Sequence, residues 1–180
     1  TFGSGALTID GNFNINPTAS SALALTVNMG AAITVAATKT TTITRTTSAT
    51  SNLDTTGTNY ALSTGNLDIA TGGTLTANGS TVTLTGTSGT LFTRTGTFTA
   101  GTSTVVMNPD AAATLTSGTI TFNNLTLSPT ITAARTYTFG SGALTIDGNF
   151  NINPTSALAL ALTVNMGAAI TVGATKTTTI

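Results

Sequence analysis

The chain has 180 residues, of which 48 are Thr, and its five cationic and five acidic side chains give a formal net charge of zero. Charged residues make up 6% of the sequence, against about 25% in an average soluble domain. So few Lys and Arg cannot neutralise a phosphate backbone, which excludes nucleic acid as an expected partner. The absence of Cys and His excludes disulfides and the usual transition-metal ligand sets, and no cofactor is expected.

The hydrophobic content, 39%, argues against disorder, because disordered segments are polar or highly charged. No run of about 20 mostly apolar residues is present, so no membrane span is predicted. The chain starts at Thr1 without a basic, apolar leader, so we expect it to be a window within a longer molecule. Its composition favours a secreted protein, located extracellularly or at the cell surface.

Strand signals recur along the chain as apolar-polar-apolar triplets. Period-2 alternation of this kind predicts strands with one buried side, and Thr, Val, Ile and Phe favour such strands. Clusters of Gly, Asn, Asp, Pro and Ser separate the triplets and predict turns. We find no convincing helical periodicity. In chain order, the triplets and their variants are 7–9, 13–15, 25–27, 33–35, 67–69, 82–84, 120–122, 125–127 and 144–146.

A long internal repeat runs over these strands. Residues 1–43 recur as residues 138–180 at an offset of 137, with 39 of 43 positions identical and differences only at 19/156, 20/157, 21/158 and 36/173. We therefore treat residues 1–137 as one full period and residues 138–180 as the start of the next copy, within one continuous segment over residues 1–180.

The spacing of the strand signals predicts a parallel β-solenoid, an all-β fold with coils of roughly 18 residues. Leu7, Leu25 and Ile43 are evenly spaced along the chain, and Leu144, Leu162 and Ile180 repeat that spacing. One period would then hold about seven or eight coils and rise on the order of 35 Å. Thr1 and Thr138 are expected in equivalent environments, related by a rise along one axis. Tandem β-sandwich domains, each one period long, remain the alternative.

The predicted core consists of the apolar residues of these triplets. A coil cannot close a core alone, so the inward side chains are expected to stack from coil to coil. The predicted inward anchors are Leu7, Ile9, Phe13, Ile15, Leu25, Val27, Ile33, Val35, Val82, Leu84, Val105, Ile120, Phe122, Leu125 and Leu127.

A family resemblance emerges between Ala100 and Ser128, which read AGTSTVVMNPDAAATLTSGTITFNNLTLS, together with the flanking GALTIDGNFNI. The segment resembles repeats of giant tandem-repeat bacterial surface proteins, which are similar to β-helical exoproteins of the filamentous-haemagglutinin and autotransporter-adhesin kind. The resemblance implies an extracellular fibre or surface layer, and carries over no functional residue.

Catalytic and metal sites are not predicted, and we do not expect an enzyme. The five Asp are scattered, whereas β-helical polysaccharide hydrolases need clustered carboxylates. Asp10 precedes Gly11, where a turn is the ordinary explanation. Gly72-Gly73 lacks the Asp series of calcium-binding nonapeptide repeats.

Surface patterns suggest other partners. T-x-T stretches resemble those of ice-binding solenoids, but a flat array needs regular coils and the anchor spacing here varies. Lys39 and Lys176, with Arg45 near the first, are candidates for contacts between neighbouring fibres or for charges that blunt an edge. Asn78 and Asn124 match the N-x-[ST] glycosylation pattern. The T-x-T stretches are 38–40, 81–83, 83–85, 93–95 and 97–99.

The sequence thus predicts a structural segment of a long extracellular or cell-surface fibre, such as a filament, stalk or adhesin shaft. Its partners would be other copies of itself, with contact to a cell surface or glycan. The alternative is a binding module with a Thr-rich face that recognises glycan or ice.

Overall fold

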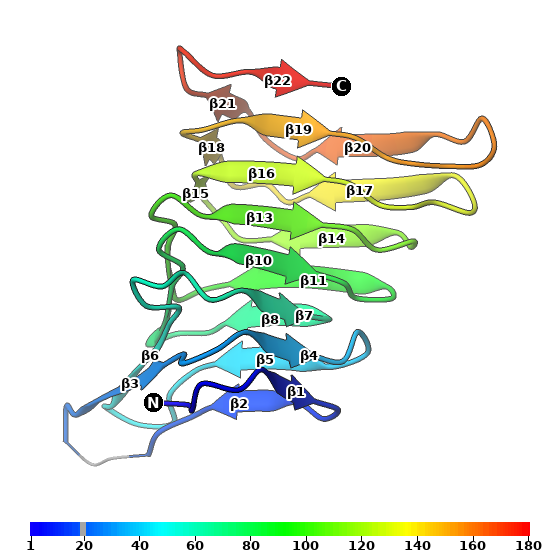
Figure 1. Cartoon of the computed structure of the whole chain (residues 1–180). Coiled ribbons are helices and arrows are strands. Elements are labelled where there is room, and N and C mark those ends of the chain that lie inside the picture. Colours follow the sequence, from blue (N-terminus) through cyan, green and yellow to red (C-terminus); the bar gives the residue numbers. More distant parts are fainter. Residues whose placement is uncertain (19–20) are drawn as a thin grey trace.

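The computed structural model describes residues 1–18 and 21–180 and shows an all-β solenoid of parallel strands (Figure 1). Within the described residues, twenty-two strands wind through seven coils of three strands each, and the last strand begins an eighth coil. The predicted fold class is confirmed, and the alternative of separate β-sandwich domains is wrong. In the described part of the chain, no helix is long and apolar enough to cross a membrane.

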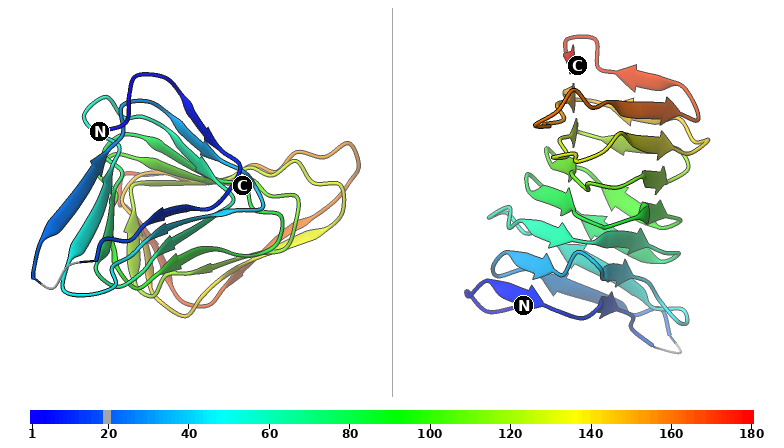
Figure 2. Two further views of the ribbon diagram at one scale, coloured as in Figure 1. Left: turned by 90° about the horizontal axis from the view of Figure 1, so that it is seen from below. Right: turned by 90° about the vertical axis from the view of Figure 1, so that its right-hand side faces the viewer.

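Each coil contributes one strand to each of three faces, which surround a roughly triangular interior (Figure 2). The first face is an eight-stranded sheet of β1 (Leu7–Ile9), β4 (Ile33–Val35), β7 (Leu62–Thr64), β10 (Thr81–Leu84), β13 (Thr104–Met107), β16 (Asn124–Leu127), β19 (Phe150–Ile152) and β22 (Thr178–Thr179). The second face is a seven-stranded sheet of β2 (Phe13–Ile15), β5 (Thr40–Ile43), β8 (Asn66–Ile69), β11 (Gly89–Arg94), β14 (Ala113–Thr116), β17 (Arg135–Phe139) and β20 (Leu162–Met166).

The third face consists of two sheets. Its lower, four-stranded sheet holds β3 (Ala24–Asn28), β6 (Thr50–Asp54), β9 (Gly73–Thr76) and β12 (Thr97–Thr99). Its upper, three-stranded sheet holds β15 (Ile120–Phe122), β18 (Leu144–Ile146) and β21 (Ile170–Val172).

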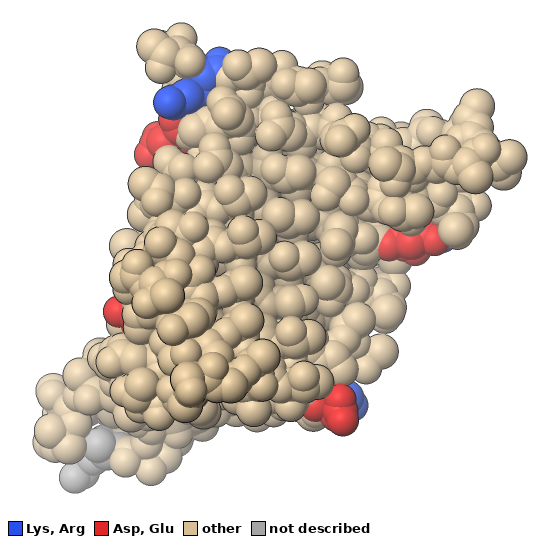
Figure 3. Space-filling model, viewed as in Figure 1, with Lys and Arg blue, Asp and Glu red and all other residues tan. Residues whose placement is uncertain are grey.

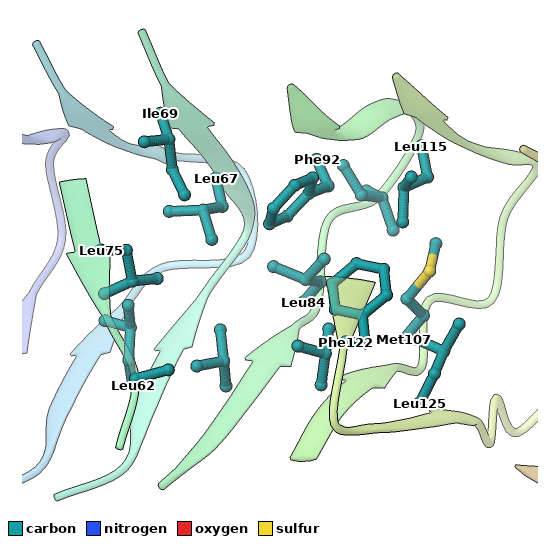
Figure 4. Packing of buried hydrophobic residues seen from close by; sticks show 14 of the residues in the cluster. Leu62, Leu67, Ile69, Leu75, Leu84, Phe92, Met107, Leu115, Phe122 and Leu125 are labelled. Atoms are coloured by element: carbon teal, nitrogen blue, oxygen red, sulfur yellow. The ribbon is translucent and has the colours of Figure 1, made fainter. Parts of the chain in front are cut away.

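The core lies between the three faces and continues from coil to coil (Figure 4). Along most strands, more and less buried residues alternate, as in β10, where Val82 and Leu84 are fully buried. In β11 the consecutive Leu91 and Phe92 are both buried, at a register shift. Leu, Ile and Val supply most of the core, because branched side chains pack well on a pleated, half-buried surface. Removal of this apolar surface from water is the main stabilising contribution to the stack.

The predicted inward anchors are correct in direction, and their burial depends on stacking. From Ile33 onward, all of the predicted anchors are buried. Leu25 is 42% exposed although its in-register partner, Ser51, is buried, because β3 belongs to the first coil and has no described coil beneath it. The other first-coil anchors are half-buried for the same reason, except Ile15, which is buried.

The predicted coil length is wrong, because every coil is longer than expected and the lengths are uneven. Leu7, Leu25 and Ile43, whose even spacing suggested the shorter coil, lie on the first, third and second faces. That spacing therefore corresponds to two of the three faces, which is two thirds of a coil and not a full coil. One full coil separates each of the in-register first-face partners Leu7, Ile33, Leu62, Val82, Val105, Leu125, Phe150 and Thr178 from the next.

The two copies of the repeat lie on different faces. β1 to β5 correspond in sequence to β18 to β22, so each strand of the second copy lies one face away from its counterpart. The offset between the copies spans seventeen strands, which is five coils and two thirds of a sixth, and not seven or eight coils. The expected relation between Thr1 and Thr138 is therefore wrong: a rise of about 27 Å is combined with a rotation by one face.

Strand pairing nevertheless repeats faithfully. Leu7 pairs with Ile33 in the first copy, and the equivalent Leu144 pairs with Ile170 in the second. A side-chain bond also recurs, since Asn12 Oδ1 accepts from the Thr40 N–H at 3.1 Å and the equivalent Asn149 Oδ1 accepts from Thr177 at 3.2 Å. Pairing register is thus a property of the local sequence, whichever face the strand occupies.

A break in the third face separates β12 from β15, and Arg94 bridges it. The Arg94 guanidinium donates to the Gly96 carbonyl at 2.8 Å within its own coil, and to the carbonyls of Ser117 (2.7 Å) and Thr119 in the next. The rings of Phe98 and Phe122 also meet across the break, with centroids 5.5 Å apart. A charged fork and an aromatic contact thus join two coils where the sheet changes.

Candidate functional site

Acidic side chains lie at separate points on the solenoid, and on the face shown in Figure 3 the charged atoms form a few small patches, two of which contain both signs. Among residues 1–18 and 21–180, no group of three or more acidic side chains is placed to hold a metal ion. Asp54 accepts from the Thr56 N–H at 2.7 Å within its own turn and from Asn78 Nδ2 at 2.7 Å in the next coil, so both contacts hold the solenoid together. Asp68 points outward from β8, and burial raises the pKa of its carboxyl group.

Asp110 forms the densest polar cluster, at the corner between the first and second faces. Its carboxylate accepts from Arg135 Nε at 2.8 Å and from the Thr132 hydroxyl at 2.5 Å. These bonds, that from Arg135 first, lower the pKa of Asp110 to about 2. Tyr137 lies buried nearby and donates to the Pro109 carbonyl at 2.8 Å, and its pKa is raised by burial and by the Asp110 charge. The cluster joins consecutive coils and offers no paired carboxylates for acid–base chemistry.

A regular polar array lies on the lower sheet of the third face, and we call it the third-face array. Its outward residues form two columns in register from coil to coil. One column is Thr26, Asn52, Thr74 and Thr97, and the other is Asn28, Asp54, Thr76 and Thr99. Neighbouring coils bond within it, as the Thr76 hydroxyl donates to Asn52 Oδ1 at 3.0 Å.

Register on this face is regular although coil length is not. The inward residues fix the strands, so extra residues accumulate at the corners, as between β6 and β7 and between β19 and β20. Uneven anchor spacing therefore does not disturb the register of the columns on this face. The predicted T-x-T stretches mostly do not contribute, because 81–85, 93–94 and 97–99 lie on three different faces. Sequence reasoning missed Thr26, Asn52 and Thr74, which only stacking brings together.

The predicted cationic contact site is dispersed. Lys39 lies at the corner between the first and second faces, whereas the equivalent Lys176 lies between the third and first. Both backbone N–H groups close the same turn, bonding at 2.8 Å to Ala36 and Gly173. Arg45 lies beyond β5, at the corner between the second and third faces, so it does not share a corner with Lys39.

Both Asn residues of the predicted glycosylation patterns take part in bonds between coils. Asn78 Nδ2 donates to Asp54 and also to the Thr55 hydroxyl at 3.2 Å. Asn124 Oδ1 accepts from the Asn149 N–H at 2.9 Å. Glycosylation at either position stays a prediction.

Among the hollows on the surface of the described residues, two have mostly apolar linings. One, of about 220 Å³, lies at a projecting corner and is lined by Thr130, Ile131, Thr132, Ser156, Ala157, Leu158 and Leu160. The other, of about 250 Å³, lies beside the first coil and is lined by Thr1, Phe2, Leu25, Thr26 and Val27. Their linings carry no charged side chain, and so no acid, base or metal ligand.

Comparison with protein-family models, with curated proteins and with solved structures finds no match for this chain.

Proposed function

We propose that this chain is a structural segment of a long extracellular or cell-surface shaft, acting through length, stiffness and packing against other copies. The observation that carries the proposal is the continuous core, in which each coil serves as the floor of the next. The fold concentrates its buried contacts along one axis, and the polar groups of its turns bond between coils. The resemblance to filamentous-haemagglutinin and autotransporter-adhesin exoproteins supports the same role.

Stiffness follows from the bonding pattern. Parallel ladders on three faces resist stretching, since extension requires hydrogen bonds to break on every face. Outward Thr and Asn columns provide a solvated surface with few charges, so neighbouring shafts would meet little repulsion. In this proposal, contact with a cell surface or glycan would occur at separate sites along the shaft, and the remaining surface would serve as a spacer.

Two measurements test the proposal. Antibodies against the chain should label intact, unpermeabilised cells of its source in thread-like or layered patterns, whereas purely intracellular label would overturn it. Stretching single molecules between their termini should give stepwise release of coils at high force. Smooth extension without resistance would remove stiffness as the basis of function.

The third-face array supports one alternative, a binding module with a Thr-rich face. Its two columns repeat at the coil spacing of about 4.8 Å, the regularity that recognition of an ordered lattice such as ice would require. Thermal hysteresis and ice-recrystallisation assays test this, with Thr74→Lys as the disrupting variant. Thr83→Lys, on the first face, is the matched control. Loss with Thr74→Lys alone supports an ice-binding face, whereas glycan-array binding without ice activity supports a glycan site.

A further inference from the structure

The junction between the fourth and fifth coils is held differently from every other junction of the described residues. On the first face β10 pairs with β13, and on the second face β11 pairs with β14. On the third face β12 and β15 share no ladder, whereas all three faces are paired at the other junctions between the seven coils. Two faces therefore carry the backbone bonds of this junction, and the third face lacks them.

Backbone orientation shows that unpaired groups lie on both sides of the break. Successive residues of a parallel strand direct their backbone groups to opposite neighbours. The Thr99 carbonyl accepts an N–H from the third coil at 2.9 Å, and the Phe122 carbonyl accepts one from the sixth coil at 3.0 Å. The backbone groups of Phe98, beside Thr99, therefore point up to the fifth coil, and those of Thr121, beside Phe122, point down to the fourth. Among the described residues, neither has a backbone partner in the coil that it faces.

Further irregularities cluster in and beneath the fourth coil. β11 contains a register shift at Leu91, and a bulge of this kind disrupts the ladder locally. The buried side-chain atoms without a hydrogen-bond partner among residues 1–18 and 21–180 are Asn66 Oδ1, Arg94 Nε and Ser103 Oγ. Arg94 and Ser103 belong to the fourth coil, and Asn66 lies in β8, directly beneath β11. Because a buried polar group without a partner lowers the stability of its surroundings, bonding is weakened around this coil.

Side chains bridge the break in place of a ladder. The Arg94 guanidinium donates to the Ser117 carbonyl at 2.7 Å and to the Thr119 carbonyl, and the Phe98 and Phe122 rings meet with centroids 5.5 Å apart. A long side chain and a ring contact can follow a change of angle between two coils by rotating about side-chain torsions, whereas a backbone ladder has to break. These contacts therefore hold the break closed without making it rigid.

We propose that this junction is a hinge of the solenoid, at which the coils above tilt away from the coils below. The third face opens, and the opposite corner, between the first and second faces, is the pivot. At that corner the ladders of both paired faces meet, and the Asn108 N–H donates to the Leu84 carbonyl at 3.2 Å. The same tilt at any other junction of the seven coils would break a third-face ladder.

The hinge deepens the proposed shaft function and rests on it, because bending at one junction matters in a molecule that acts through stiffness. The shaft would bend towards the corner between the first and second faces, since only the third face opens. The two proposals fail separately. Exchange and cross-linking in the purified chain test the hinge, whereas labelling of intact cells tests where the shaft is located.

Native-state amide exchange of the full chain tests the hinge with two matched pairs of amides. Beside the third face, the N–H groups of Thr104 and Asn124 each donate to the coil below at 3.0 Å, the first across the hinge and the second across the next junction. After correction for intrinsic rates, Thr104 should exchange more than about tenfold faster, because opening the hinge breaks fewer bonds. At the pivot, the equivalent Asn108 and Ser128 should differ by less than about threefold. Equal protection of Thr104 and Asn124 would overturn the hinge, and fast exchange at both Thr104 and Asn108 would overturn the pivot.

A disulfide across the open side should abolish the difference. The chain has no cysteine, so Thr93→Cys with Thr116→Cys, the last in-register pair of the second face before the break, forms a single lock. Oxidation should slow exchange at Thr104 to the level of its in-register neighbour one coil higher, and reduction should restore the fast rate. Thr114→Cys with Thr138→Cys, in register across the next junction, is the matched control and should leave Thr104 fast. Equal effects of the two locks, or no effect of either, would overturn the inference.

Discussion

Replacing Gly142 or Gly5 with alanine tests whether coil stacking limits side-chain size at the corner before a Leu-Thr-Ile strand. The two glycines occupy equivalent positions in identical local sequence, Ser-Gly-Ala-Leu-Thr-Ile. A Cβ atom on Gly142 would lie 1.9 Å from the Gly118 carbonyl carbon and 2.4 Å from the Thr119 nitrogen in the coil below. A Cβ atom on Gly5 meets no described atom within 4 Å.

The expected loss of stability in Gly142→Ala follows from the movement of the two coils that the added Cβ atom would force. Ordinary contact begins near 3.4 Å, so the two coils would have to separate locally by on the order of 1.5 Å. That movement stretches the bond from the Ile120 N–H to the Ala143 carbonyl, now 3.0 Å. Overpacking costs about 1–3 kcal/mol and the weakened bond about 1 kcal/mol. Both variants gain about 0.4–1 kcal/mol through the unfolded chain, which cancels in the comparison.

We therefore expect Gly5→Ala to be neutral or slightly stabilising, and Gly142→Ala to be less stable than Gly5→Ala by about 2–4 kcal/mol. Thermal unfolding followed by far-UV circular dichroism should separate their midpoints by roughly 4–16 °C. Amide exchange at Ile120 should accelerate in Gly142→Ala alone, since the clash is local. Equal stabilities within about 0.5 kcal/mol would refute the stacking geometry at this corner.

Five further substitutions test the core, the bridge and the two carboxyl groups whose pKa is shifted. Phe122→Ala should lose about 3–5 kcal/mol in denaturant unfolding, and Phe122→Leu less than about 2 kcal/mol, because the buried ring packs on Phe92 and Phe98; a loss below about 1 kcal/mol for alanine would contradict its place in the core. Arg94→Lys should cost about 1–3 kcal/mol and accelerate amide exchange around the break in the third face, since an ammonium cannot reproduce the fork that binds three carbonyls; wild-type protection in the variant would speak against the bridge. The pKa of Asp110 is lowered from 3.8 to about 2, so its contribution is complete above about pH 4 and is lost as pH falls towards 2; Asp110→Asn should lack this acid-dependent part of the unfolding curve. The sign is opposite for Asp68, because burial raises its pKa and penalises the charged form: Asp68→Asn should be more stable than wild type at pH 7 and equal to it at pH 3, and a gain at both pH values would point to another cause.

The strands could be predicted from the sequence because each triplet carries its own alternation. Leu144-Thr145-Ile146 forms a strand on the third face and Leu7-Thr8-Ile9 forms one on the first, with the same partner register. A side chain is buried only when it points inward and a neighbouring coil covers it. The predicted anchor Leu25 points inward but is still exposed, because it lies in the first coil.

Coil length could not be predicted in the same way. An apolar triplet marks a strand but does not record how sharply the chain turns at its corner. Three strands complete each coil here, so the even spacing of Leu7, Leu25 and Ile43 covers only two thirds of a coil. The third-face array was missed for the same reason, since Thr26, Asn52 and Thr74 become neighbours only when coils of unequal length are stacked.

The long internal repeat shows where the two kinds of information divide. By itself the sequence determined the strands and their inward residues, because these follow from the alternation within each triplet. Only the tertiary structure decided which face each strand occupies and whether its side chains are covered. The physical reason is that rotation accumulates over every corner of the stack, and that burial of one coil is supplied by another.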